Sequence, residues 1–276
     1  MIHTAAYGVR MRIVGVHGVG NHDPARSPAA AAERLATTWA AALDGVGQMD
    51  LVIAYYAHHL RQDTAQSTED IDLVDDDVAK LVLAWAAAIG VPAELSHGPA
   101  TVPLRYLADW VARRFGLDTR LVRWFVAVFF REVAAYLAET DGASRVAARD
   151  EVAGVIERHR PDIVVAHSLG TVVTYEALAA NPHLKVDLLV TLGSPLGMPD
   201  VVFERLLPAP DGRLPGVRRW VNIADAGDLV AIPRRLGDRF ATDADHEEAI
   251  GLFDFHRVRK YLAAELTRKV LTNQDG

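Results

Sequence analysis

The chain of 276 residues contains no cysteine. This absence excludes disulfide bonds, thiolate metal sites and a cysteine nucleophile. The chain also lacks an excess of positive charge, because 29 Lys and Arg residues stand against 36 Asp and Glu residues, for a formal net charge of −7. A mildly acidic chain does not attract nucleic acid or anionic lipid over long distances, so we expect no nucleic-acid partner.

Long apolar runs are also scarce. The most apolar window, residues 121–138, contains Arg123, Arg131 and Glu132 and is too short to cross a bilayer comfortably. We interpret it as a buried helix, with a lid or membrane-surface helix beside an apolar pocket as the alternative. The first residues lack the basic start, apolar core and small-residue cleavage site of a signal peptide. We therefore expect no transmembrane segment and a cytoplasmic protein.

Apolar segments of two lengths alternate in the first and last parts of the chain. Short apolar runs predict buried strands over residues 11–16, 50–57, 162–166, 186–192 and 217–224. Longer amphipathic segments predict helices over residues 28–43, 144–159, 171–180 and 256–269. This alternation indicates an α/β protein with a mostly parallel, doubly wound sheet covered by helices on both faces.

The middle of the chain has a different pattern. Residues 78–89, 104–115 and 121–138 have helical spacing, and prolines separate some of these segments. A helical block between two strand-bearing regions predicts an inserted cap. The expected organisation is a core of residues 1–60 and 144–276, with a helical cap insertion at 61–143.

The strongest local motif is Ala-His-Ser-Leu-Gly, with Ser168 at its centre. Ala166 and Gly170 lie two positions before and after the serine. A tight turn from strand to helix needs small residues there, because the two backbones nearly collide. Such a turn exposes the hydroxyl at the carboxyl edge of the sheet, and the N-terminus of the next helix favours negative charge beside it.

This motif resembles the nucleophile elbow of the α/β-hydrolase family, Gly-x-Ser-x-Gly. The chain departs from it at Ala166, and lipase-like members of the family include such Ala-x-Ser-x-Gly variants. The resemblance implies that Ser168 is a nucleophile. The segments HGVGN, from His17, and HxxxxYL, from His256, are similar to the bacterial lipase-like branch related to GPI-inositol deacylases.

A His-Gly segment after the first strand supplies part of the oxyanion hole in this family. The resemblance implies that the backbone N–H groups of Val19, or a close neighbour, and of Leu169 bind the oxyanion. Gly18 and Gly20 would shape the loop, since glycine lets the backbone approach the substrate. The side chain of His17 would be structural.

The family order of nucleophile, acid and base implies the remaining members of the site. Asp228 matches the Asn…Asp-x-Val pattern that family members often carry here, with Asp225 as the alternate acid. His256, at the start of the last predicted helix, is the expected base, with His246 as the alternate. Either aspartate would otherwise be a turn residue or a helix cap.

The sequence thus predicts a serine esterase or lipase-like enzyme that uses the triad Ser168, His256 and Asp228, forms an acyl-enzyme and needs no cofactor. A peptidase, a thioesterase and an acyltransferase on the same triad are alternatives. The expected partner is a small-molecule or acyl substrate. Aromatic residues of the cap are expected to line an acyl pocket, fill the core or form a homodimer interface: Trp110, Phe115, Trp124, Phe125, Phe129 and Phe130.

Two other enzyme or cofactor classes have partial support. A metal-dependent hydrolase would use polar residues after the first two strands: His17, His22, Asp23, His58 and His59. Adjacent histidines on an extended strand point to opposite faces, which argues against that class. The glycines after the first strand are spaced G-x-x-G-x-G and not G-x-G-x-x-G, which argues against a dinucleotide site. A binding protein of the same fold that lacks catalysis is the third alternative.

Overall fold

The computed structural model describes residues 10–60, 74–92, 104–138, 142–250 and 256–272. Within them, one sheet has the strand order β2-β1-β3-β4-β5-β6, and every neighbouring pair is parallel. The strands are β1 (Met11–Val16), β2 (Met49–Ala54), β3 (Ile163–His167), β4 (Val186–Leu192), β5 (Val217–Asp225) and β6 (Ala244–Glu248). Because all strands run the same way, their carboxyl ends meet at one edge of the sheet.

Both faces of the sheet are buried, which explains why its central strands are apolar at successive positions. In β1, Ile13 belongs to one hydrophobic cluster and Val14 to the other. In β3, Val165 and Val164 divide in the same way, as the period of two in a strand requires. The strands therefore show near-continuous apolar runs and not alternation of apolar and polar residues.

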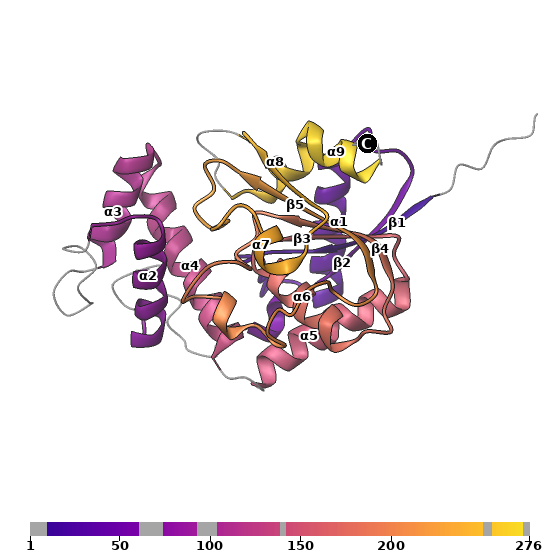
Figure 1. Ribbon diagram of the computed structural model, residues 1–276, viewed down its shortest axis with the longest axis horizontal. Helices are drawn as coiled ribbons and strands as arrows, with labels where there is room; N and C mark the ends of the chain where they lie inside the picture. Colours follow the sequence, from indigo (N-terminus) through magenta and orange to yellow (C-terminus); the bar gives the residue numbers. More distant parts are fainter. Residues whose placement is uncertain (1–9, 61–73, 93–103, 139–141, 251–255, 273–276) are drawn as a thin grey trace, which may run out of the picture.

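Helices cover the two faces (Figure 1). On one face lie α1 (Pro28–Ala42), α8 (Val258–Ala263) and α9 (Glu265–Leu271). On the other face lie α5 (Ala143–His159) and α6 (Leu169–Ala180). This is the doubly wound parallel sheet of the α/β-hydrolase fold, and the predicted fold class is confirmed.

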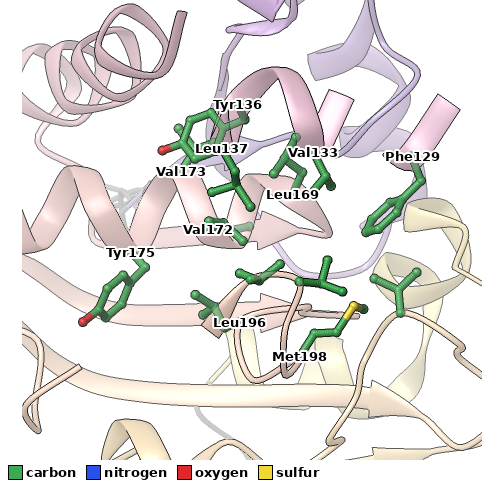
Figure 2. Close-up of a cluster of buried hydrophobic side chains, with 14 of the residues drawn as sticks. Phe129, Val133, Tyr136, Leu137, Leu169, Val172, Val173, Tyr175, Leu196 and Met198 are labelled. Atoms are coloured by element: carbon green, nitrogen blue, oxygen red, sulfur yellow. The ribbon is translucent and has the colours of Figure 1, made fainter. Parts of the chain in front are cut away.

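In the described residues between β2 and α5 lie the helices α2 (Asp76–Ala88), α3 (Leu104–Phe115) and α4 (Thr119–Leu137). Figure 2 shows Val133 and Leu137 of α4 beside Leu169 and Val172 of α6, so α4 packs directly on the helix that follows the elbow. Residues 61–73, 93–103 and 139–141 of the expected cap lie outside the described residues. The division of the chain into core and cap stays a prediction.

The end of the chain differs from the prediction of one helix over residues 256–269. His256 precedes the helix with a φ of 63°. The helical segment is divided into α8 and α9 at Ala264, whose φ of −64° and ψ of 141° are extended. The single long helix was therefore wrong.

Several short elements were not predicted from the sequence. They are β6, the short helix α7 (Gly237–Phe240) and the 3-10 turns η1 (Ala57–Leu60) and η4 (Phe203–Arg205). β6 has the polar sequence ADHEE and pairs only with β5 among the described strands, so it carries no apolar signal of a buried strand. None of the helices in these described ranges is long and apolar enough to cross a membrane.

Candidate active site

Ser168 lies at the tip of the turn between β3 and α6. Its φ of 56° and ψ of −132° lie in a region that residues with side chains rarely adopt, and the residue is completely buried. Its amide donates to the carbonyl of Leu192 at 3.1 Å. A Cβ atom at Gly170 would lie 2.4 Å from the carbonyl oxygen of His17. Only glycine therefore lets the first turn of α6 approach the loop after β1.

The structure brings Ser168, His256 and Asp228 together as one hydrogen-bonded series. The Nε2 atom of His256 is 2.6 Å from the Oγ atom of Ser168. The Nδ1 atom of the same ring is 2.8 Å from Oδ2 and 3.1 Å from Oδ1 of Asp228. Phe125 and Phe129 of α4 contact the His256 ring edge to face, so the imidazole is fixed from both the polar and the apolar side.

Asp228 is held ionised by the groups around it. Burial raises its pKa, but the opposite effects of His256, of a hydrogen bond from Tyr261 and of one from the Val230 amide lower it to about 2. Tyr261 donates its hydroxyl to Oδ2 at 2.6 Å, and the Val230 amide donates to Oδ1 at 2.8 Å. An ionised Asp228 accepts the Nδ1–H of His256, which leaves Nε2 to accept the proton of Ser168.

The alternate acid and base lie elsewhere. Asp225, at the end of β5, accepts hydrogen bonds from the amides of Gly227 at 3.3 Å and Ile250 at 3.2 Å. Its carboxylate therefore joins its own turn to the segment that follows β6. His246 lies on β6 in register with Ile223, and its Nε2 atom has no hydrogen-bond partner in the described part of the chain.

His17 fixes the loop after β1. Its Nδ1 atom is 2.8 Å from the carbonyl of Gly18, and its Nε2 atom accepts the amide of Tyr56 at 3.2 Å. Because an amide only donates, Nε2 is the unprotonated nitrogen and Nδ1–H donates to Gly18. Burial lowers the pKa of His17 to about 4, so the ring is neutral at pH 7. This environment fits the structural role expected for His17.

Asn21 orients two peptide groups of the loop, the one between Gly18 and Val19 and the one between Val19 and Gly20. Its side-chain amide donates to the carbonyl of Gly18 at 2.9 Å and to that of Val19 at 3.1 Å. In a trans peptide the N–H points away from the preceding carbonyl. The N–H groups of Val19 and Gly20 therefore point away from Asn21. This residue was not among the predicted site residues, since only the folded loop shows what its side chain contacts.

Of these two N–H groups, that of Gly20 is already occupied. It donates to Oε1 of Glu132, on α4, at 2.8 Å. The N–H of Val19, a residue that lines the cavity described below, has no hydrogen-bond partner in the described part of the chain. The loop also lies directly against the elbow, because a Cβ atom at Gly18 would be 2.6 Å from Cβ of Ser168. Leu169, the first residue of α6, is at a position where helix geometry leaves the amide without a helical partner.

Replacing Glu132 by Gln is expected to change how stability depends on pH. Burial raises the pKa of Glu132 to about 7, although the hydrogen bond from Gly20 opposes this, and its Oε2 atom has no partner in the described ranges. The folded protein therefore binds the proton more tightly than the unfolded chain, and wild type loses this stabilisation as pH rises from about 4.5 to about 7.

The Glu132→Gln variant has no charge to bury at this position, so its stability does not decrease in this way as pH rises. Relative to wild type, its free energy of unfolding should rise by up to about 3 kcal/mol between about pH 4.5 and about pH 8. Urea unfolding of both proteins across this range measures the difference. A difference that is constant with pH would contradict the expectation.

A cavity of about 350 Å³ adjoins the triad. One wall is apolar and comes from α4, with Leu121, Trp124 and Phe125. The remaining lining residues come from the loop after β1, the elbow and the start of α8: Val19, Asn21, His167, His256, Arg257, Val258 and Arg259. Of the aromatic residues expected in a cap, Trp124 and Phe125 thus line the cavity, whereas Phe129 and Phe130 are completely buried core residues.

Among the described residues, the histidines after the first two strands are not grouped as metal ligands. In the described ranges, no group of three or more His, Cys, Asp or Glu side chains has the arrangement to hold a metal ion. Both ring nitrogens of His17 are already hydrogen-bonded within the protein. His58 and His59 lie in η1 with ring centroids 3.8 Å apart, and not on opposite faces of an extended strand as expected.

No protein-family model matches the chain, and no curated protein matches it in sequence. Among solved structures, the crystal structure of dienelactone hydrolase from Anabaena variabilis is similar at 13% sequence identity, with a TM-score of 0.35. The similarity covers 95% of this chain and 86% of that chain.

Proposed function

We propose that this protein is a serine hydrolase that cleaves carboxylic esters. The observation that carries the proposal is the hydrogen-bonded series from Asp228 through His256 to Ser168, with the serine at a strained turn. A nucleophile, a base within 2.6 Å of it and an ionised acid that orients the base are the three parts that acyl transfer needs. Cysteine is absent, so serine is the available nucleophile of this type.

The first step is formation of an acyl-enzyme. Oγ of Ser168 attacks the ester carbonyl carbon while its proton moves to Nε2 of His256. The carbonyl oxygen becomes an oxyanion, which the N–H groups of Val19 and Leu169 bind. The C–O bond to the alcohol then breaks as His256 returns the proton to the leaving oxygen. Asp228 stabilises the imidazolium throughout this step.

The second step is hydrolysis of the acyl-enzyme. Water attacks the acyl carbon and gives its proton to Nε2 of His256. The bond from the acyl carbon to Oγ of Ser168 breaks, and the proton returns to the serine as the carboxylic acid leaves. Each proton released in this cycle is taken up again, so the two steps balance without a cofactor.

The experiment that tests the proposal is labelling by a fluorophosphonate, followed by intact mass. Such a probe forms a bond between phosphorus and an activated serine oxygen and expels fluoride. Wild type is expected to gain the mass of one phosphonyl group, and the Ser168→Ala variant is expected to gain none. Circular dichroism of both proteins controls for folding. No labelling of folded wild type, or equal labelling of the variant, would overturn the assignment.

Replacing Asn21 by Ala is expected to lower kcat about 10-fold to 100-fold on a neutral ester, with KM nearly unchanged. Loss of one oxyanion donor costs about 100-fold to 1,000-fold, and this variant loosens a donor without deleting it. The matched control is Thr37→Ala, an exposed change on α1 that removes one side-chain hydrogen bond far along the chain from the loop. An unchanged kcat for Asn21→Ala would contradict the role of Asn21 in orienting Val19.

A further inference from the structure

The cavity beside the triad combines an apolar wall with basic groups. Leu121, Trp124 and Phe125 form the apolar wall, and Arg257 and Arg259, at the start of α8, also line the cavity. Both arginines are exposed, so they lie where the cavity opens to solvent. Among the described lining residues there is no Asp or Glu. This basic surface is local, because the whole chain has a formal net charge of −7.

The two arginines bring positive charge to the cavity, which suits an anion. Arg259 forms no ion pair in the part of the chain that the structure describes. A guanidinium donates paired hydrogen bonds to a carboxylate or phosphate and stays charged at all relevant pH values. The apolar wall on α4 has no group to bind such a charge, so the charged part of a ligand would lie at the cavity opening and its apolar part against Trp124 and Phe125.

One further polar residue, His167, lies beside the same cavity. The ring of His167 is only 6% exposed, lines the cavity, and has an Nε2 atom without a hydrogen-bond partner among the described residues. Burial, together with the nearby His256, lowers the pKa of His167 well below its usual range, so the ring is neutral.

We infer that the substrate is an ester with an apolar body and an anionic group, the body packed against the α4 wall and the anionic group bound by Arg257 and Arg259. This inference rests on the proposed function, because it concerns the same site. It specifies the chemical class of the ester: a half-ester of a dicarboxylic acid, or an ester whose alcohol carries a carboxylate.

The test compares matched pairs of esters that differ only in charge. On the acyl side, the pair is 4-nitrophenyl hexanoate and the mono-4-nitrophenyl ester of adipic acid. On the alcohol side, the pair is 4-carbamoylphenyl hexanoate and 4-carboxyphenyl hexanoate. Ser168→Ala gives the background rate for each ester. Wild type is expected to have the higher kcat/KM for the charged member of at least one pair, and added salt should reduce this preference.

The variants Arg259→Gln and Arg257→Gln/Arg259→Gln are expected to lower the ratio of kcat/KM for the charged ester to kcat/KM for the neutral ester at least threefold, because they remove the charge that binds the anion. Lys260→Gln is the matched control, because it removes an exposed positive charge from the same helix at a position that does not line the cavity. A preference lost equally in Lys260→Gln would reflect overall charge and would overturn the inference.

Two failures are distinguishable. If wild type is labelled at Ser168 and hydrolyses the neutral esters but prefers neither charged ester, the anionic substrate class is wrong and the proposed function stands. If wild type is neither labelled nor active on any of the four esters, the proposed function fails, and the inference fails with it.

Discussion

The Asp228→Asn variant is expected to lose about 10⁴-fold in kcat on any ester that the wild type hydrolyses. Both oxygens of this carboxylate already accept hydrogen bonds, from Tyr261 and His256 at Oδ2 and from Val230 at Oδ1. Asn at this position would place its NH₂ group against one of these hydrogen-bond donors in either orientation of the side-chain amide. With NH₂ toward His256, the ring must carry its proton on Nε2 and is unable to accept the proton of Ser168.

The amide also lacks the negative charge that stabilises the imidazolium. The loss should therefore appear in kcat and in kcat/KM to a similar extent, because the interaction is strongest in the transition state. Fluorophosphonate labelling should slow in parallel, since it depends on the same activated serine. Steady-state kinetics and labelling rates of the purified variant measure both effects.

Asp225→Asn is the matched control for this prediction. The two aspartates lie three residues apart in the same loop, and both are buried. The carboxylate of Asp225 accepts the amides of Gly227 in its own turn and of Ile250 after β6, and not His256, so its loss should cost some stability while kcat stays within about fivefold of wild type. A larger loss in Asp225→Asn than in Asp228→Asn would refute the choice of acid. Melting temperatures of both variants separate unfolding from loss of chemistry.

The sequence predicts those site residues that can be recognised from the residues next to them in the chain. Ser168 is recognisable because an apolar run, two small residues and a helix occur within a few positions of it. Strands β1 and β4 begin and end where the sequence predicts, because they are buried on both faces and bounded by polar or turn residues.

The parts that the sequence does not predict depend on contacts between distant residues. The hydrogen bond from the Gly20 amide to the Glu132 carboxylate joins positions that are 112 residues apart, and no local pattern specifies it. The same holds for Asn21, whose position in a glycine-rich loop suggests only a turn. β6 was missed because an edge strand need not be apolar. The preference for Asp228 over Asp225 comes from the family pattern and not from local spacing, since Asp225 ends β5 and Asp228 follows only three residues later.

A buried ion pair that joins α5 to α6 leads to the largest expected change in stability. Arg145 and Glu176 are 2% and 0% exposed as side chains, and the Nε atom of Arg145 donates to Oε2 of Glu176 at 3.0 Å. Glu176 also accepts the hydroxyl of Tyr136, on α4, at 2.7 Å and the amide of Leu207 at 3.0 Å. Three helices and a loop thus meet at one carboxylate.

Replacing either charged partner alone by Ala, as in Glu176→Ala or Arg145→Ala, should lower the free energy of unfolding by about 3–5 kcal/mol, because the other charge is left buried without its counterion. The double variant Arg145→Met/Glu176→Leu should lose much less, since it removes both charges and refills the space with apolar groups. Tyr136→Phe removes one hydrogen bond and should cost about 1–3 kcal/mol. Urea unfolding of the set at one pH gives these differences.

The double variant decides what this cluster contributes. If it is as unstable as either single variant, the network of hydrogen bonds to Tyr136 and Leu207, and not the burial of an unpaired charge, accounts for the loss. If it is nearly as stable as wild type, the ion pair adds little net stability and instead specifies how α4 and α5 pack on α6. In that case the stable double variant should also have a lower kcat. The reason is that α6 begins directly after Ser168 and that Phe125 and Phe129 of α4 contact the His256 ring, so the packing of these helices positions the site.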